Sequence, residues 1–178
     1  MKNFRKLLLS PSGRISRLSY IVGTLALLVL YGFQHYLYPV LGKGLLSFFV
    51  PMAFFFLNMH IIFCINGKRL HDMGRSAWPL FFMFFFLIAA TFFVGMKFGM
   101  LEYFESVSKL TSDPVLQKDP EAMRAAIKPL EEAYQSNMKA NMGKISILLA
   151  AIPIAFTAWL ALMPGQKNKN RYGEKPTR

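Results

Sequence analysis

Residues 66–79 concentrate the side chains of this chain that could carry acid–base chemistry. Their sequence, NGKRLHDMGRSAWP, sets His71 directly before Asp72 and places basic residues on both sides. A histidine oriented by a carboxylate is a common general base, but adjacent helical residues point about 100° apart, so adjacency alone does not bring the two side chains together. The segment has no nucleophile elbow, no glycine-rich phosphate loop and no pair of carboxylates. We therefore expect no enzyme activity, and we interpret the segment as a basic border beside a membrane span, partly neutralised by Asp72.

His60 and Cys64 form the second pair whose spacing could do chemistry. Four residues apart, they share a helix face and could offer two ligands to a soft or borderline metal. Metal sites need three or four ligands, and no further Cys or His lies near in sequence. Counted from the predicted cytoplasmic ends of their spans at about 1.5 Å per residue, His35 lies about 22 Å deep and His60 about 8 Å deep. The two therefore cannot bind one haem iron from opposite faces. We predict no metal and no cofactor.

Asn58 and His60 are polar residues inside an otherwise apolar stretch. Such groups face other helices or a water-filled cavity. Two interpretations stay open, namely hydrogen bonds between helices and a transport pathway, and the first is favoured because such bonds are common in helix bundles.

The composition is that of a membrane protein. Hydrophobic residues make up 54% of the 178 residues, including 18 Phe and 11 Met, more than the roughly half found in soluble domains. The formal charge of +12 could suggest a nucleic-acid partner, but the basic residues punctuate long apolar runs and do not line a soluble surface. We predict no nucleic-acid binding. We interpret the positive charge as a determinant of membrane topology and of contact with lipid head groups.

Four stretches are long enough to cross a hydrocarbon core of about 30 Å as helices, at residues 20–40, 45–65, 79–100 and 145–163. The first follows basic residues but has no small-residue cleavage site, so we expect a retained span and no cleaved signal peptide. The predicted fold class is all-α, a polytopic membrane protein with four transmembrane helices and one membrane domain over residues 1–178.

The distribution of Lys and Arg predicts the orientation of these spans. Three segments are strongly basic: the N-terminal segment, residues 66–78 and the tail at 164–178. Together they carry thirteen of the 21 basic residues and two of the nine acidic ones. Their net charge is +11, whereas the rest of the chain has a net charge of +1. The positive-inside rule places both termini in the cytoplasm of a multi-pass protein of the bacterial inner (plasma) membrane.

Residues 102–144 are the one part that has a soluble composition. Asp113 and Asp119 each precede a proline, the pattern of a helix cap with proline in the first turn. We predict short amphipathic helices here, forming a periplasmic insertion between the third and fourth spans.

Three separated motifs, GRISRLSY at 13–20, KRLHDMGRSAW at 68–78 and PGQKNKNRYGEKP at 164–176, resemble the YhaH-like family of bacterial inner-membrane proteins, domain of unknown function 805. We call these three motifs the cap. The resemblance implies a small polytopic inner-membrane protein without an assigned activity. The matching positions are Gly13, Arg14, Arg17, Tyr20, Arg69, Leu70, His71, Asp72, Arg75, Ser76, Trp78, Pro164, Gly165, Asn170, Arg171, Tyr172, Gly173 and Pro176.

The chain departs from the family pattern at several places. Pro79 stands where a second aromatic residue is usual, KNK lengthens the last motif, Lys175 replaces an acid, and the segment at 102–144 is longer than usual.

We predict a non-catalytic module that contacts lipid or another protein through the cap, with the bilayer and anionic head groups as partners and a membrane protein or a second copy as further possible partners. The alternative is a small oligomeric transporter or channel subunit that uses Asn58 and His60. Within the cap, we expect Asp72 to accept hydrogen bonds from at least one arginine, and Trp78 and Tyr172 to lie at the membrane–water interface.

The topology is testable with single cysteines introduced into a Cys64→Ser background. An impermeant maleimide applied to intact cells should label Ser112→Cys and leave Ser12→Cys and Thr177→Cys unlabelled until the membrane is opened. Labelling at positions 12 or 177 but not at 112 would invert the model.

Overall fold

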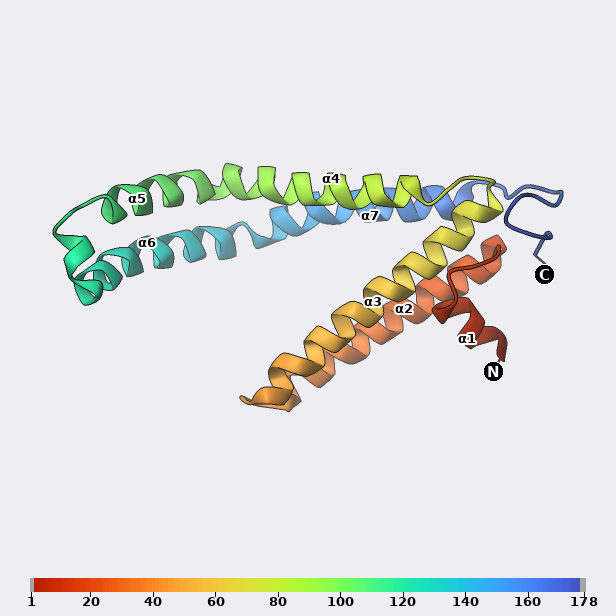
Figure 1. The fold of residues 1–178 in the computed structure, drawn as a ribbon, viewed down its shortest axis with the longest axis horizontal. Helices are drawn as coiled ribbons and strands as arrows, with labels where there is room; N and C mark the ends of the chain where they lie inside the picture. Colours follow the sequence, from red (N-terminus) through yellow and green to blue (C-terminus); the bar gives the residue numbers. More distant parts are fainter. Residues whose placement is uncertain (1, 177–178) are drawn as a thin grey trace. The chain divides into compact units, whose positions relative to one another are not determined.

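The computed structural model describes residues 2–176 and the side chains of residues 6–176 (Figure 1). The described residues form helices joined by short turns. The α-helices are α1 (Lys2–Leu9), α2 (Arg17–Leu37), α3 (Leu45–Asp72), α4 (Trp78–Gly95), α5 (Leu101–Thr111), α6 (Pro120–Ala140) and α7 (Met142–Leu162). The predicted all-α fold class is confirmed.

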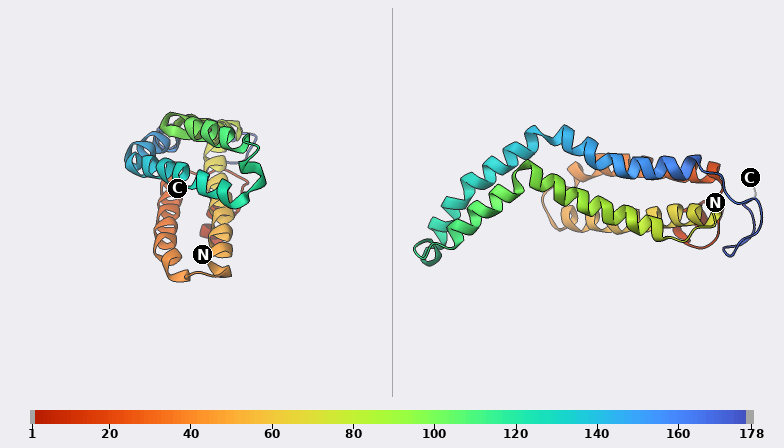
Figure 2. Two further views of the ribbon diagram at one scale, coloured as in Figure 1. Left: turned by 90° about the vertical axis from the view of Figure 1, so that its left-hand side faces the viewer. Right: turned by 90° about the horizontal axis from the view of Figure 1, so that it is seen from above.

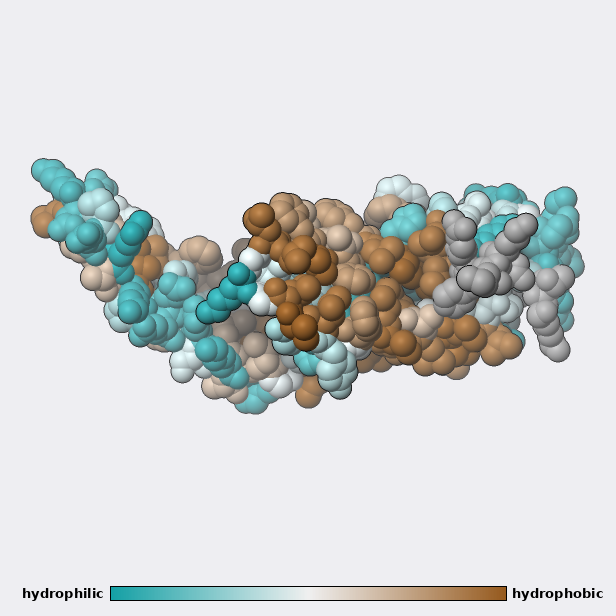
Figure 3. Space-filling model, turned by 90° about the horizontal axis from the view of Figure 1, so that it is seen from below, coloured by the Kyte–Doolittle hydropathy of each residue, from teal (hydrophilic) through white to brown (hydrophobic). Residues whose placement is uncertain are grey.

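Within the described residues, four helical stretches are long and apolar enough to cross a membrane, as predicted. They are Arg17–Leu41, Leu45–Asp72, Trp78–Thr111 and Met142–Leu162. Figure 3 shows hydrophobic side chains over the face that α2 and α3 present, and hydrophilic ones over the hairpin of α5 and α6. An exposed apolar surface of this extent is unfavourable in water and is matched by lipid. Contact with the bilayer follows.

The chain divides into two compact units, one made of residues 1–82 with 156–178 and the other of residues 83–155. The first unit contains α1, α2, α3 and the C-terminal tail, and therefore all three motifs of the cap. The second unit contains α5 and α6.

In the first unit, α2 and α3 pack along each other (Figure 2). A Cβ atom at Gly23 would lie 3.1 Å from Ile65 Cδ1, so the glycine permits close approach of the two helices. Small residues commonly serve this purpose between helices in lipid.

Polar side chains join the same two helices farther from the cap. Asn58 Nδ2 donates to Gln34 Oε1 at 2.9 Å, and Gln34 Nε2 donates back to Asn58 Oδ1 at 3.2 Å. The Tyr38 hydroxyl also donates to Gln34 Oε1, at 3.1 Å. Each amide therefore satisfies the other where lipid offers no hydrogen bonds.

The helix α3 is longer than predicted, because it continues past residue 65 to Asp72. A hydropathy criterion places the end of a span before the first charged residue, whereas the helix in the structure ends just before a glycine. Gly74 has a φ of +76°, its N–H donates to His71 O at 3.0 Å, and the Arg75 N–H donates to Leu70 O at 2.8 Å. These two bonds form a Schellman motif, whose left-handed position favours glycine. The first half of the segment at 66–79 is therefore the last two turns of a helix.

In the second unit, the chain passes from α4 to α5 through a π-helical turn at Met96–Met100. Gly99 has a φ of +103° there, and the Phe98 carbonyl accepts from Asn137 Nδ2 of α6 at 3.0 Å. The Tyr103 and Tyr134 rings stack between α5 and α6 with centroids 5.3 Å apart. A carbonyl freed by the turn is therefore satisfied by the neighbouring helix.

The two predicted aspartate caps differ in outcome. Asp119 Oδ1 accepts from the N–H groups of Glu121 and Ala122, both at 3.0 Å, at the start of α6, which confirms that prediction. Asp113 Oδ1 accepts from the Val115 N–H at 2.8 Å and forms a turn before one 3₁₀ turn. The helix that follows Asp113 is therefore only a three-residue 3₁₀ helix, Leu116–Lys118, before Asp119 starts α6.

The amide pair between α2 and α3 is testable by a double-mutant cycle with Gln34→Leu and Asn58→Leu. Each single change removes the hydrogen bonds between the two amides, so the two changes should couple by about 0.6 kcal/mol, and by no more than about 1.7 kcal/mol. The readout is the free energy of unfolding in mixed micelles. The control combines Asn58→Leu with Thr91→Val, because Thr91 bonds only its own helix, and should be additive. Additivity in both cycles would contradict the pairing.

Candidate functional site

Asp72, the last residue of α3, joins two arginines inside the cap. Its Oδ2 lies 2.5 Å from Arg69 Nη1, and its Oδ1 lies 3.1 Å from both Nε and Nη2 of Arg14. The side chains are buried, with exposed fractions of 6% for Asp72, 0% for Arg69 and 1% for Arg14. The expected arginine–carboxylate contact is confirmed, and it involves two of the three motifs.

Arg69 uses its remaining donors on the C-terminal end of α7. Its Nε donates to Leu160 O at 2.8 Å, and its Nη2 donates to Met163 O. The last carbonyls of a helix have no partners within the helix and carry partial negative charge. A buried cation is therefore well placed at this helix end.

Arg14 uses its remaining donors on the C-terminal tail. Its Nη2 donates to Gln166 O at 2.5 Å, and its Nη1 donates to Asn168 O at 2.8 Å and to Gly173 O at 3.2 Å. The tail thus surrounds one guanidinium group with backbone oxygens. Within the described side chains, every buried polar atom has a hydrogen-bond partner.

Gly165 completes the enclosure of the carboxylate. A Cβ atom at this position would lie 1.9 Å from Asp72 Oδ2, which no side chain tolerates. The next residue, Gln166, donates its N–H to Asp72 O at 2.8 Å. Backbone of the tail therefore packs directly on the ion cluster, by which we mean Arg14, Arg69 and Asp72.

His71 points away from the ion cluster and does not pair with Asp72. Its Nδ1 lies 3.3 Å from Gly13 O, and because a carbonyl only accepts, Nδ1 carries the proton in this bond. The ring stacks on Tyr172 with centroids 3.9 Å apart and planes 8° from parallel. Tyr172 is held by a turn in which Asn170 Oδ1 accepts the Tyr172 N–H at 2.9 Å and Asn170 Nδ2 donates to His71 O at 2.9 Å.

The other predicted cap residues lie around the ion cluster without joining it. Arg75 lies over the Trp159 ring at 5.4 Å and Arg171 over the Tyr172 ring at 4.7 Å. Arg17 is exposed at the first position of α2. Ser76 lies in the turn between α3 and α4, and Trp78 at the start of α4 is exposed. The location of Trp78 and Tyr172 relative to a membrane surface stays a prediction.

Tyr20 and the predicted intramembrane residues make hydrogen bonds to other parts of the first unit. Tyr20 is buried, and its hydroxyl donates to Asn66 Oδ1 at 3.0 Å. His60 Nε2 lies 3.0 Å from Leu9 O and 3.5 Å from Cys64 Sγ, as expected for residues on one helix face. Across residues 6–176, no group of three or more His, Cys, Asp or Glu side chains is arranged to hold a metal ion.

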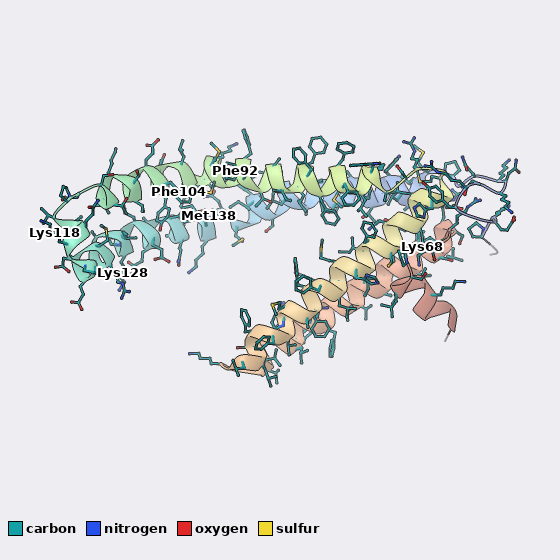
Figure 4. All side chains as sticks on the ribbon, viewed as in Figure 1. Lys68, Phe92, Phe104, Lys118, Lys128 and Met138 are labelled. Atoms are coloured by element: carbon teal, nitrogen blue, oxygen red, sulfur yellow. The ribbon has the colours of Figure 1, made fainter. Side chains whose placement is uncertain are left out.

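Sequence reasoning missed Lys68, which ties α3 to the unpredicted helix α1 (Figure 4). Its Nζ donates to Lys6 O at 2.8 Å and to Leu7 O at 2.5 Å, the last turn of α1. Gln34, the partner of Asn58, was missed as well. The same signal that singled out Asn58, an amide inside an apolar run, would have found it.

A groove of about 600 Å³ opens beside the ion cluster. It lies between the start of α2, the end of α3 and the tail. Its lining includes Ser16, Arg17, Leu18, Ser19, Arg69, Asp72, Pro164, Gly165, Gln166, Lys167, Lys175 and Pro176.

Removing the charge of Asp72 should destabilise the protein strongly, because Asp72→Asn leaves two buried guanidinium groups without their counter-ion. Breaking a buried pair from one side costs about 3–5 kcal/mol. The matched control is Glu174→Gln, whose carboxylate pairs with Lys169 at 2.9 Å on the surface and should contribute under about 1 kcal/mol. Melting temperatures in mild detergent provide the comparison. Equal small shifts would show that the cluster contributes no more than a surface ion pair.

One comparison with known proteins gives a match. A family model described as "Protein of unknown function (DUF805)" matches residues 8–174, a range that contains the four candidate spans and nearly all of the cap. No curated protein and no solved structure matches the chain. The chain is a multi-pass membrane protein that belongs to the DUF805 family.

Proposed function

We propose that the protein is a non-catalytic membrane module whose cap holds anionic lipid head groups at the border of the spans. The observation that carries this proposal is that both acidic side chains of the cap already pair with basic side chains of the cap. The cap contains nine basic and two acidic residues, and Asp72 and Glu174 each accept from basic residues of the cap itself.

Four of the nine basic side chains have partners inside the protein. Arg14 and Arg69 contact Asp72, Lys169 pairs with Glu174, and Lys68 caps α1. The other five are exposed and have no carboxylate within ion-pair distance among the described residues: Arg17, Arg75, Lys167, Arg171 and Lys175. Cations beside an anionic membrane surface each contribute about 1 kcal/mol of attraction.

The engagement of the reactive groups supports a role without catalysis. Both oxygens of Asp72 are occupied by guanidinium donors, so this carboxylate neither acts as a base nor orients His71, whose Nδ1–H is directed to Gly13 O instead. A general base needs a free lone pair within reach of a substrate.

The transporter alternative would require Asn58 and His60 to face a pathway. Asn58 pairs with Gln34, and His60 reaches the Leu9 carbonyl. These contacts support a packing role, and no observation favours transport.

The proposal is testable by fluorescence quenching with brominated lipids in reconstituted vesicles. The two tryptophans, Trp78 and Trp159, lie in or beside the cap, so quenching reports lipid there. Brominated phosphatidylglycerol should quench more strongly than brominated phosphatidylcholine, and the preference should fall with added salt, because exposed charges are screened over about 10 Å at moderate ionic strength.

A pair of charge-matched variants gives the decisive comparison. Replacing the five exposed cap cations by Gln should abolish the preference for the anionic lipid. The control replaces five basic residues of the second unit by Gln: Lys109, Lys118, Arg124, Lys128 and Lys139. Figure 4 shows Lys118 and Lys128 of this set at the end of the α5–α6 hairpin. Equal loss in both variants, or turnover of a lipid that depends on His71 or Asp72, would overturn the proposal.

A further inference from the structure

The groove beside the ion cluster gathers three positive charges from separate segments. Arg17 comes from the start of α2, Lys167 from the turn after α7, and Lys175 from the end of the tail. All three are exposed, and none has a carboxylate within ion-pair distance among residues 6–176. Like charges brought around one opening repel each other, and an anion bound between them removes that repulsion.

No acid of the cap is free to supply that anion. Asp72 lines the groove, but Arg14 and Arg69 already occupy its two oxygens. Glu174, next to Lys175 in sequence, pairs with Lys169 at 2.9 Å. The groove therefore lacks a described internal counter-ion.

The rest of the lining fits a phosphate group at a membrane border. The hydroxyl groups of Ser16 and Ser19 lie 3.1 Å apart, so one donates to the other and the second hydroxyl can donate to a phosphate oxygen. The first turn of α2 adds partial positive charge. Leu18, which is 70% exposed, and two prolines form an apolar rim around the groove. The groove stands where the candidate span Arg17–Leu41 begins, which is the level at which lipid phosphates lie.

We propose that this groove binds the phosphate monoester of a membrane lipid in preference to a phosphate diester. A monoester carries a charge of about −1.5 to −2 near neutral pH, because its second pKa is about 6, whereas a diester carries one charge. Three cations around one opening are better neutralised by the monoester. This inference rests on the proposed function, since it names the head group that the cap selects.

The test uses the full chain in mild detergent, with lipid binding measured by native mass spectrometry. Phosphatidic acid is the monoester probe, and phosphatidylglycerol is the diester probe with the same acyl chains. Phosphatidic acid should bind about fivefold more tightly, the effect of one further charge at a membrane surface. The variant Arg17→Gln/Lys167→Gln/Lys175→Gln should lose this preference. The control Lys109→Gln/Lys128→Gln/Lys139→Gln removes equal charge from the second unit and should keep it.

The outcomes separate this inference from the proposal on which it rests. Equal binding of the two lipids, both weakened by the groove variant, would overturn monoester selection and leave anionic lipid contact standing. Binding of neither lipid would overturn both. Inorganic phosphate that competes weakly, at millimolar concentration, supports a lipid phosphate in the groove, whereas phosphate that binds as tightly as phosphatidic acid would assign the groove to a soluble anion and overturn the lipid.

Discussion

The buried carboxylate of Asp72 is the constraint on which the cap depends. An isolated charge cannot leave water without a cost of several kcal/mol, so Asp72, Arg14 and Arg69 are stable in the interior only together. The two guanidinium groups then need acceptors for their remaining donors, and these are carbonyls at the end of α7 and in the tail. Neutralising one acid therefore also fixes where two distant segments lie. Well-packed apolar residues can often replace such clusters without loss of stability, so the contacts described here are evidence for where the segments lie and not for a large net stabilisation.

The same logic extends to the pairing of α2 with α3. Helices in lipid gain little from burying apolar surface against each other, because the lipid tails are equally apolar. Selection of a partner then depends on close approach and on the few polar groups present. Gly23 provides the close approach, and the amides of Gln34 and Asn58 provide the polar contact. The exposed phenylalanines of α4 need no protein partner, since lipid is their solvent.

The sequence predicted that Asp72 contacts an arginine, but not which arginines and which carbonyl groups complete the cluster. Asp72 is the only acid among the basic residues of its segment, which made pairing with an arginine predictable. Nothing in the sequence distinguishes Arg14 and Arg69 from Arg17 or Arg75, because the choice depends on where α3 ends and how the tail folds. The carbonyl acceptors are invisible to sequence reasoning, since every residue has one. By contrast, the end of α3 was within reach, because Gly74 just beyond Arg69 and His71 is a helix-termination signal that hydropathy obscured.

The enclosure of Arg14 by the tail has a consequence for how the protein is made. The carbonyl of Asn168 lies 154 residues beyond Arg14 in the chain, so the two can meet only after synthesis has passed residue 168. Until then Arg14 and Arg69 lack these backbone acceptors, and their remaining donors must bond to water. Folding of the tail onto the ion cluster is thus the step that removes water from Arg14, Arg69 and Asp72. In this fold, burial of charged residues from the first and second motifs therefore waits for the arrival of the third.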